Sequence, residues 1–185
     1  LKEVKMENLN PYIGKELTWL QPDVYIEDYE LCDGDSIIGT LKFRSKYGTL
    51  ATAETTDGKW TFKRVGFFSP KISIRQVGND ADFATFKFGT WNEGGEVVLQ
   101  DGTKYRASNN FWHTRMAFID DQDQVMLKYP DIGGMFRRSV TLKVYPAAAS
   151  IEKSSWLVML SWYLVVMMQR EAAEDPTPEQ ARIAT

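Results

Sequence analysis

The sequence predicts a β-rich domain, either a barrel or a sandwich, that shelters one helix buried near the C-terminal end of the chain. Two observations support this fold class. About twelve short extended runs follow one another, and then comes a segment, residues 156–168, in which twelve of thirteen residues are apolar. Aromatic residues make up 13% of the chain, which suits strands because rings pack against their neighbours on a pleated surface. A length of 185 residues fits one domain.

The extended runs are separated by turn signals. Asp33-Gly34, Asp57-Gly58 and Asp101-Gly102 predict hairpins, because Asp and Gly tolerate the left-handed backbone of tight turns. Apolar and polar residues alternate over residues 71–75 and 85–88, so each of these runs has one apolar face. Short strands at regular spacing are typical of barrels and sandwiches. The predicted strands are residues 16–21, 24–31, 36–44, 49–55, 59–64, 71–76, 83–89, 96–99, 104–107, 111–119, 125–129 and 139–144.

A faint internal repeat with an offset of 44 residues supports a regular architecture. In both copies an Asp-Gly pair is followed by an aromatic residue, two adjacent aromatic residues, a basic residue and then alternating apolar residues. The first copy runs from Asp57 to Ile74 and the second from Asp101 to Phe118. Two explanations stay open: a true duplication, or hairpins of one sheet that meet the same packing requirements.

The apolar segment 156–168 predicts a helix that is hydrophobic all round, which belongs either in a protein interior or in a bilayer. At about 1.5 Å per residue the segment spans roughly 20 Å, whereas a bilayer core about 30 Å thick needs about 20 apolar residues. Its mixture of Met, Trp and Tyr also favours an irregular protein core. We therefore predict a buried helix, with a membrane anchor as the alternative. Pro146 is expected to end the last strand, and Ser150 is the expected N-cap.

The expected organisation is an N-terminal arm (residues 1–15), a barrel with a central helix (residues 16–171, the helix at about 150–171) and a flexible polar tail (residues 172–185). A single cysteine, Cys32, excludes an internal disulfide and favours a reducing compartment. The first residues lack the apolar core of a signal peptide, so the expected location is cytoplasmic, at the periphery of a membrane if lipid is bound. A net charge of −3 gives no electrostatic footprint for nucleic acid.

Many short strands followed by one apolar C-terminal helix resemble the tubby-like superfamily, which includes the tubby C-terminal domain, the LURP-one-related proteins and the phospholipid scramblases. The resemblance covers roughly residues 17–170 and rests on the order of elements, the strand count and the 156–168 helix. It implies a mainly β fold, a closed antiparallel barrel of about twelve strands around a buried hydrophobic C-terminal helix. A barrel of this width needs such a filling, because its own side chains do not fill the lumen.

Scramblases also have an acidic, calcium-linked segment of the form Asp-x-Asp-x-Phe. Residues 80–83 read Asp-Ala-Asp-Phe, which is similar but lacks the spacer before the phenylalanine. Residues 84–89 add only one side-chain oxygen, that of Thr85, whereas calcium takes about six to eight oxygen ligands. We therefore expect a polar hairpin loop here and predict no metal site.

Two other groups of residues are better explained by structural roles than by a catalytic or metal-binding site. His113 is the only histidine and is expected to pack within a strand; no local motif supports a dyad with Cys32. Asp120, Asp121 and Asp123 are expected to form a solvated hairpin loop, because no EF-hand spacing surrounds them.

A glycine pair precedes two arginines near the end of the strand region, at Gly133-Gly134 and Arg137-Arg138. This group is expected to be a flexible loop, since no strand-loop-helix context for a phosphate loop surrounds it. No catalytic residue set is predicted, and no cofactor.

The candidate binding site consists of four basic residues on two neighbouring predicted strands: Lys63, Arg64, Lys71 and Arg75. If they converge on one face of the barrel, they can bind a phosphorylated lipid headgroup through charge-assisted hydrogen bonds. Tubby domains bind phosphoinositides in roughly this manner, so the resemblance implies the same class of ligand. The alternative is that they are only the outward positions of amphipathic strands, which is favoured by the interleaved acids Glu54, Asp57, Asp80 and Asp82.

The expected function is that of a non-enzymatic binding or scaffold module that contacts anionic phospholipid or a protein partner. Two other classes stay open. One is a carrier of a small apolar ligand inside a β-barrel. The other is an enzyme with dispersed carboxylates, such as a glycosidase, which no motif in the sequence supports.

Overall fold

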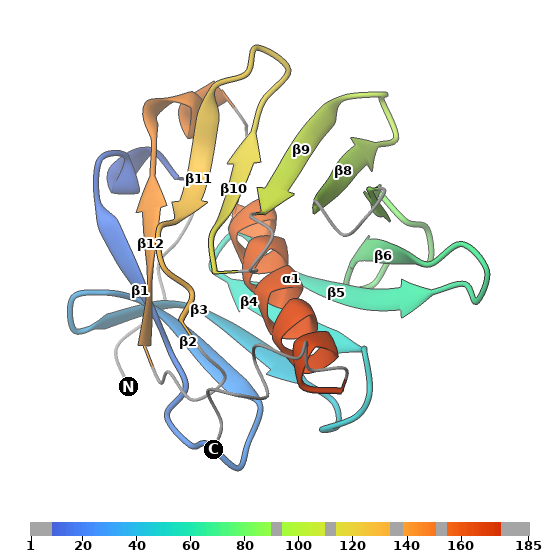
Figure 1. Cartoon of the computed structure of the whole chain (residues 1–185). Coiled ribbons are helices and arrows are strands. Elements are labelled where there is room, and N and C mark those ends of the chain that lie inside the picture. The colour runs from blue at the N-terminus through green and yellow to red at the C-terminus, as the bar shows by residue number, and fades with distance from the viewer. Residues whose placement is uncertain (1–8, 90–93, 110–113, 134–138, 151–154, 175–185) are drawn as a thin grey trace.

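The structure is a computed structural model, and it describes residues 9–89, 94–109, 114–133, 139–150 and 155–174. Strands dominate this part of the chain, and one α-helix follows them (Figure 1). The helices are η1 (Asn10–Tyr12), η3 (Pro146–Ser150) and α1 (Ser155–Glu174). The strands are β1 (Glu16–Leu20), β2 (Asp28–Asp33), β3 (Ser36–Phe43), β4 (Ala51–Thr55), β5 (Gly58–Val65), β6 (Lys71–Gln76), β7 (Ala84–Phe88), β8 (Gly94–Leu99), β9 (Lys104–Asn109), β10 (Met116–Ile119), β11 (Val125–Tyr129) and β12 (Ser139–Val144).

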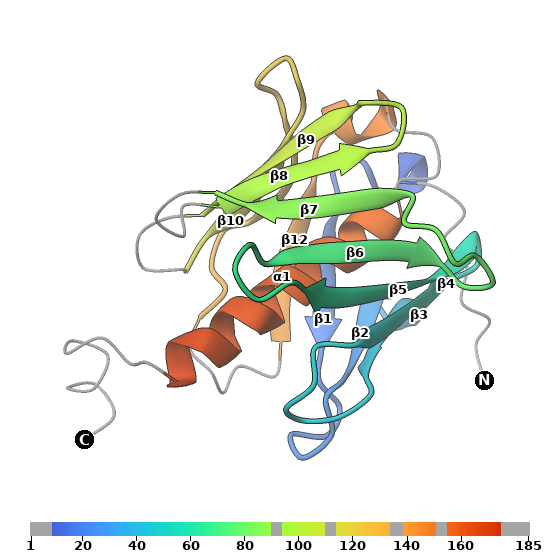
Figure 2. The same cartoon turned by 90° about the vertical axis from the view of Figure 1, so that its right-hand side faces the viewer.

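The twelve strands form one closed barrel in which each strand pairs with its neighbours in the sequence. The ring is closed by β1 and β12, which pair antiparallel from Glu16 opposite Lys143 to Leu20 opposite Ser139. The predicted closed antiparallel barrel is therefore confirmed, and the sandwich alternative is wrong. Because consecutive strands run antiparallel, the loops after odd-numbered strands lie at one end of the barrel and the loops after even-numbered strands at the other (Figure 2).

Alternate side chains of the strands point into the lumen, as expected for a pleated backbone. Ile72 and Ile74 of β6 are fully buried, and Met116 and Phe118 of β10 are buried at the matching positions. These are the alternating apolar residues of the internal repeat. Its Asp-Gly pairs lie where β4 turns into β5 and where β8 turns into β9. The adjacent aromatic residues of the second copy, 111–112, lie outside the described residues.

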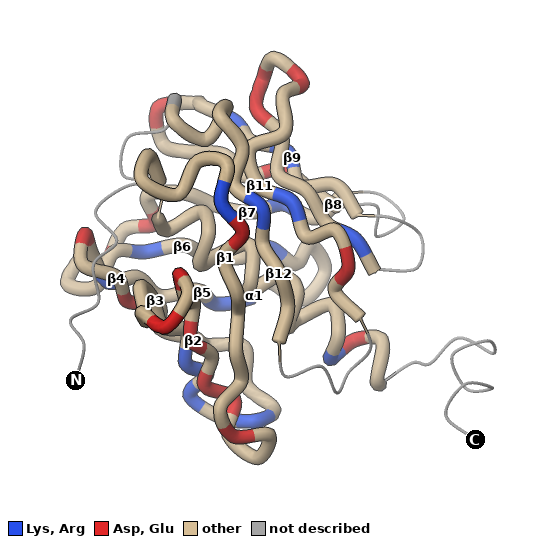
Figure 3. Tube along the Cα trace, turned by 90° about the vertical axis from the view of Figure 1, so that its left-hand side faces the viewer, with Lys and Arg blue, Asp and Glu red and all other residues tan. Residues whose placement is uncertain are grey.

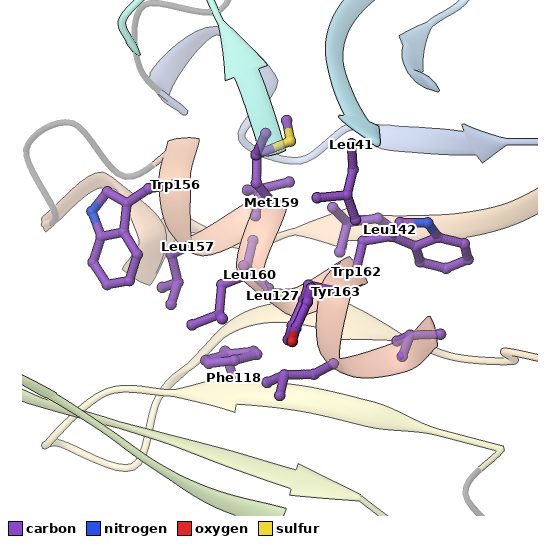
Figure 4. Close-up of a cluster of buried hydrophobic side chains, with 14 of the residues drawn as sticks. Leu41, Phe118, Leu127, Leu142, Trp156, Leu157, Met159, Leu160, Trp162 and Tyr163 are labelled. Carbon is purple, nitrogen blue, oxygen red and sulfur yellow. The ribbon is translucent and has the colours of Figure 1, made fainter. Parts of the chain in front are cut away.

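Helix α1 lies inside the barrel, with strands around it in both views (Figures 1 and 2). Residues 155–167 of the helix are all buried. The apolar ones among them belong to one cluster with strand residues that include Leu41, Phe118 and Leu142 (Figure 4). The prediction of a buried helix is thus confirmed. Within the described residues, no helix combines the length and the apolarity that crossing a bilayer requires.

Stacked aromatic rings hold the helix in place. Trp162 stacks on Trp19 of β1, with ring centroids 5.3 Å apart, and meets Tyr29 of β2 edge-on at 5.6 Å. One residue further on, Tyr163 stacks on Phe43 of β3 at 5.5 Å. Aromatic pairs of this geometry stabilise a core beyond the area that they bury. The Trp and Tyr residues of the apolar segment therefore have specific partners on the first three strands.

Ser161 is the one polar residue of the predicted apolar segment, and a buried chain of hydrogen bonds accounts for it. Trp19 Nε1 donates to the Tyr129 hydroxyl at 3.1 Å, and that hydroxyl lies 2.7 Å from Ser161 Oγ. Ser161 Oγ donates its proton to the carbonyl of Val158 at 2.7 Å, so Tyr129 donates to Ser161. Burial raises the pKa of Tyr129, although the hydrogen bonds with Ser161 and Trp19 oppose this shift.

Two strands begin four or more residues later than predicted. The predicted run 24–31 becomes a strand only at Asp28, because Asp23 closes a turn before it. The side chain of Asp23 accepts the backbone N–H of Tyr25 at 2.9 Å, and its backbone carbonyl accepts the N–H of Ile26 at 3.2 Å. This Asp-initiated turn competes with extended backbone. The predicted run 111–119 contains β10 only from Met116, and residues 111–113 lie outside the described residues.

The two ends of the chain are described in part. Leu9 and Tyr12, from the predicted N-terminal arm, are buried in the core, whereas residues 1–8 lie outside the described residues. Ser150 ends η3, and residues 151–154 are not among those described, so the N-cap stays a prediction. Helix α1 continues to Glu174, three residues past the predicted limit of 171; residues 175–185 of the predicted tail also fall outside.

Candidate anion-binding face

Three of the four predicted site residues lie on the outer face of the barrel. Lys63 of β5 and Lys71 and Arg75 of β6 are exposed, and they alternate with buried residues such as Phe62 and Ile74. The alternation follows from the pleat of each strand, which turns successive side chains to opposite faces. The β5–β6 ladder therefore brings these three basic residues to one side of the sheet.

Arg64, the fourth predicted residue, lies on the inner side of β5. Its guanidinium forms an ion pair with Glu171 of α1 and lies over the ring of Phe88, with Cζ 5.2 Å from the ring centroid. Because side chains alternate along a strand, Arg64 and its neighbour Lys63 point to opposite faces. The structure therefore does not bring Arg64 together with the other three.

Lys87 of β7 joins the outer basic residues, and sequence reasoning missed it. In the β6–β7 register Lys87 lies directly opposite Lys71, and both side chains are exposed. Opposite residues in antiparallel strands have Cβ atoms about 4.5–5.5 Å apart, and like charges placed there are destabilising. An anion held between the two ammonium groups would relieve this repulsion.

Lys63, Lys71 and Lys87 together are called the lysine face below. Within the described part of the chain, none of the three forms an ion pair with an acidic residue. Glu96 of β8 lies opposite Lys87 on its other side, but the Glu96 carboxylate bonds to Lys104 at 3.1 Å. Among the described residues, the lysine face therefore presents positive charges that no acidic side chain is bonded to.

An open hollow of about 220 Å³ lies on the outer surface of β6, β7 and β8, and Lys71 and Lys87 line it. Thr85 and Gln100 contribute a hydroxyl and an amide to the same lining. All four side chains can donate hydrogen bonds, and those from charged donors to phosphate oxygens are the strong ones. The hollow can thus bind an anionic oxygen group at the surface.

Asp82 is the acidic residue of this lining, and its charge is already compensated. Ser73 Oγ donates to Asp82 Oδ1 at 2.5 Å, and Arg75 Nε donates to the same oxygen at 2.6 Å. Burial opposes ionisation of the carboxyl, but these hydrogen bonds and the charge of Lys71 outweigh it and lower the pKa of Asp82. The guanidinium of Arg75 is therefore bonded to Asp82, whereas the ammonium group of Lys71 forms no ion pair with Asp82.

A second Lys–Lys pair on the barrel shows the contrast. Lys128 of β11 lies opposite Lys143 of β12, but Lys143 bonds to Glu16 of β1 at 2.7 Å. That hydrogen bond with Glu16 raises the pKa of Lys143. On this side of the barrel, basic and acidic positions are interspersed (Figure 3). An acid compensates the second pair, which makes it a matched control for the lysine face.

Other residues singled out in the sequence have structural roles or are not described. Asp120 Oδ1 accepts the backbone N–H groups of Gln122 and Gln124, at 2.9 and 2.8 Å, and so closes the β10–β11 turn. The described residues include no group of three or more His, Cys, Asp or Glu side chains placed to hold a metal ion. Cys32 is buried. Of the residues singled out in the sequence, His113, Gly134, Arg137 and Arg138 lie outside the described ranges.

The fold and the face define a closed antiparallel β-barrel with a central helix and a group of lysines on the outer side of β5, β6 and β7. A fold of this kind has been seen in a protein from Arabidopsis thaliana, whose X-ray structure matches with a TM-score of 0.56. The match has 10% sequence identity and covers 87% of this chain and 95% of that one. At this identity the likeness shows the shared fold alone. No protein-family model and no curated protein matches the sequence.

Proposed function

We propose that this protein is a non-enzymatic binding module that contacts anionic phospholipid headgroups through Lys63, Lys71 and Lys87. It acts at the cytoplasmic surface of a membrane, where basic residues are attracted by anionic lipid. The proposal includes membership of the tubby-like superfamily. That membership is supported by the order of elements and by the closed barrel of twelve strands around one C-terminal helix.

The observation that supports lipid contact most is the Lys71–Lys87 pair. Two ammonium groups stand opposite each other across β6 and β7, beside a hollow, with no bonded acid in the described part of the chain. Such a pair lowers the stability of the free protein and favours a ligand whose oxygens bridge both charges. A lipid phosphate has these oxygens.

The carrier alternative is less well supported. An apolar ligand would need the lumen of the barrel, and the side chains of residues 155–167 of α1 are buried there. A protein partner stays a second candidate for the lysine face and becomes an outcome of the experiment below.

Neutralising the Lys71–Lys87 pair is expected to weaken membrane binding about 30-fold. Each lysine near an anionic surface contributes about 1 kcal/mol, so Lys71→Gln with Lys87→Gln removes about 2 kcal/mol of attraction. Flotation of the purified chain with phosphatidylcholine vesicles, with and without phosphatidylserine or a phosphoinositide, measures the change. Only the anionic vesicles are expected to retain the unmodified protein.

The matched control is Lys128→Gln with Lys143→Gln, which changes the net charge equally at a cross-strand pair five strands away around the ring. This control is expected to bind within about twofold of the unmodified chain. Equal losses in the two double variants would mean that net charge alone drives binding, and the lysine face would lose its role. If the unmodified chain does not float with anionic vesicles, the lipid proposal fails and a protein partner becomes the leading candidate.

A further inference from the structure

The large apolar side chains that the described residues expose are concentrated at one end of the barrel. Val77 lies in the β6–β7 loop, at the end where even-numbered strands finish. The others lie in loops that follow odd-numbered strands, β1–β2, β3–β4 and β5–β6, and so share the opposite end. These six residues are Val24, Tyr25, Ile26, Tyr47, Phe67 and Phe68.

The same end holds the C-terminal part of α1, which is bonded to all three hairpins. Arg170 forms an ion pair with Glu27, which precedes β2, and Arg170 Nη1 donates to the carbonyl of Gly48 in the β3–β4 loop at 2.7 Å. Glu171 pairs with Arg64 near the end of β5. Figure 2 shows the three loops and this end of the helix on the same side of the barrel. The C-terminal part of α1 therefore links the three hairpins.

The loop tips present their aromatic rings to solvent. Phe67 and Phe68 are 90% and 96% exposed and contact each other edge-on, with centroids 5.1 Å apart. Gly66 begins this turn with φ +87°, and a Cβ there would lie 2.7 Å from the carbonyl oxygen of Ser69. Only glycine fits such a close approach without strain. The backbone thus holds the two phenylalanines outward.

The other two tips present tyrosines. Tyr25 is 90% exposed at the turn closed by Asp23, and Tyr47 is 88% exposed, with Lys46 Nζ 5.9 Å from its ring centroid. Tyrosine has an apolar ring and a polar hydroxyl, which suits the boundary between lipid and water. Phenylalanine, which has no polar group on its ring, suits the acyl region on the lipid side of that boundary.

The lysine face lies next to these tips. Lys71 is the first residue of β6, directly after the loop that contains Phe67 and Phe68, and it pairs with Val65, the last residue of β5. Lys87 lies opposite Lys71, so both charges are near the same end. Of the described acids at this end, Glu27 and Glu171 are bonded to the arginines named above. Asp28 pairs with Lys42 at 3.3 Å, and Asp23 accepts the backbone N–H of Tyr25 within its own turn. Positive charge that no described acid is bonded to, placed beside exposed rings, is complementary to an anionic bilayer.

We propose that the β1–β2, β3–β4 and β5–β6 loops insert into the interfacial region of an anionic bilayer, with Phe67 and Phe68 deepest. This proposal rests on the proposed function and adds an orientation to it. The end of the barrel that holds the loops after odd-numbered strands faces the membrane. The lysine face then meets the headgroups at the side of the barrel. A lipid surface is favoured because the exposed rings lie on three different turns and the lysine face beside them matches the charge of an anionic bilayer.

The single cysteine makes a direct test practical. Cys32 is 5% exposed, so a nitroxide label reacts selectively at a cysteine introduced by Phe68→Cys, with the unmodified chain as the labelling blank. On phosphatidylserine vesicles, this label is expected to become several-fold less accessible to a water-soluble nickel chelate and more accessible to oxygen. A label at Val77→Cys, on the opposite end, is expected to keep its accessibilities.

Binding read in the same samples separates the two proposals. If the chain floats with vesicles but the label at position 68 stays accessible to the nickel chelate, insertion is wrong and headgroup binding stands. If the chain does not float, headgroup binding is wrong and insertion falls with it. The double variant Phe67→Ser with Phe68→Ser gives a second readout. It is expected to bind about tenfold more weakly, and its remaining binding is expected to stay salt-dependent. The Lys71, Lys87 double variant is expected to lose most of the salt dependence of its binding. An unchanged affinity in the Phe67, Phe68 double variant would also overturn insertion.

Discussion

Replacing Trp162 with alanine is expected to lower the free energy of unfolding by about 3–5 kcal/mol, the usual cost of removing a large buried aromatic side chain. Trp162 lies inside the barrel, stacked on Trp19 and tilted against Tyr129 with ring centroids 5.9 Å apart. Alanine would leave a cavity between the helix and three strands. Urea unfolding followed by circular dichroism measures the loss.

Two variants frame this result. Trp162→Phe is expected to cost less than about 1.5 kcal/mol, because most of the ring contact remains and the indole N–H has no hydrogen-bond acceptor among the described residues. Tyr25→Ala removes an aromatic ring that is 90% exposed and is expected to change stability by less than about 0.5 kcal/mol. A loss at Trp162→Ala no larger than at Tyr25→Ala would contradict the position of the helix.

Stability is expected to fall steeply above pH 10, because the barrel buries protonated tyrosines. Burial raises the pKa of Tyr29 to about 12, with Glu27 adding to the shift and Arg170 opposing it. Burial also raises the pKa values of Tyr129 and Tyr163. In the unfolded chain these hydroxyls ionise near the ordinary tyrosine value of 10.0. Above that pH the unfolded state therefore binds fewer protons than the folded state, and the equilibrium shifts towards unfolding.

The sign and size of this effect follow from proton linkage. The stabilisation by each buried tyrosine is complete below pH 10 and falls by about 1.4 kcal/mol per pH unit until the folded group ionises. For Tyr29 the loss between its unfolded and folded pKa values amounts to about 3 kcal/mol. Urea midpoints measured from pH 9 to about 11.5 give the slope.

Tyr129→Phe isolates one contribution. This variant is less stable at pH 8, because Trp19 Nε1 and Ser161 lose a hydrogen-bond partner, but its decline above pH 10 is expected to be shallower by about 1.4 kcal/mol per pH unit. Tyr25→Phe, at an exposed position, is expected to leave the slope unchanged. A slope that is identical in the unmodified chain and in Tyr129→Phe would mean that Tyr129 ionises as readily in the folded barrel as in the unfolded chain.

The sequence predicted the main elements because their signals are local. Strand alternation around Ile72 and Ile74 depends only on neighbouring residues, and the all-apolar character of residues 156–168 requires burial wherever the segment lies. Closure of the barrel followed from the resemblance to a known fold rather than from any residue pattern. The late start of β2 was missed because Asp23 closes a turn that alternation does not reveal.

The candidate site was harder to predict because it depends on register. Lys87 has the same alternating signal as Lys71, but its position opposite Lys71 becomes visible only once the two strands are paired. Arg64 was grouped with Lys63 although adjacent residues of a strand face opposite ways, a conflict that strict use of alternation would have exposed. Arg75 bonds to Asp82 across the β6–β7 loop. Only the tertiary structure shows that this bond makes the charge of Arg75 less available to a ligand.

Residue-resolved hydrogen exchange tests most directly whether α1 fills the lumen. If strands surround the helix, its amides between residues 157 and 167 can exchange only when the barrel opens, and they are expected to exchange with the same free energy as the most protected strand amides. Helix amides that exchange faster than those of β3 and β11, in a separate and earlier step, would show that the helix leaves or lies outside the barrel and would contradict the account.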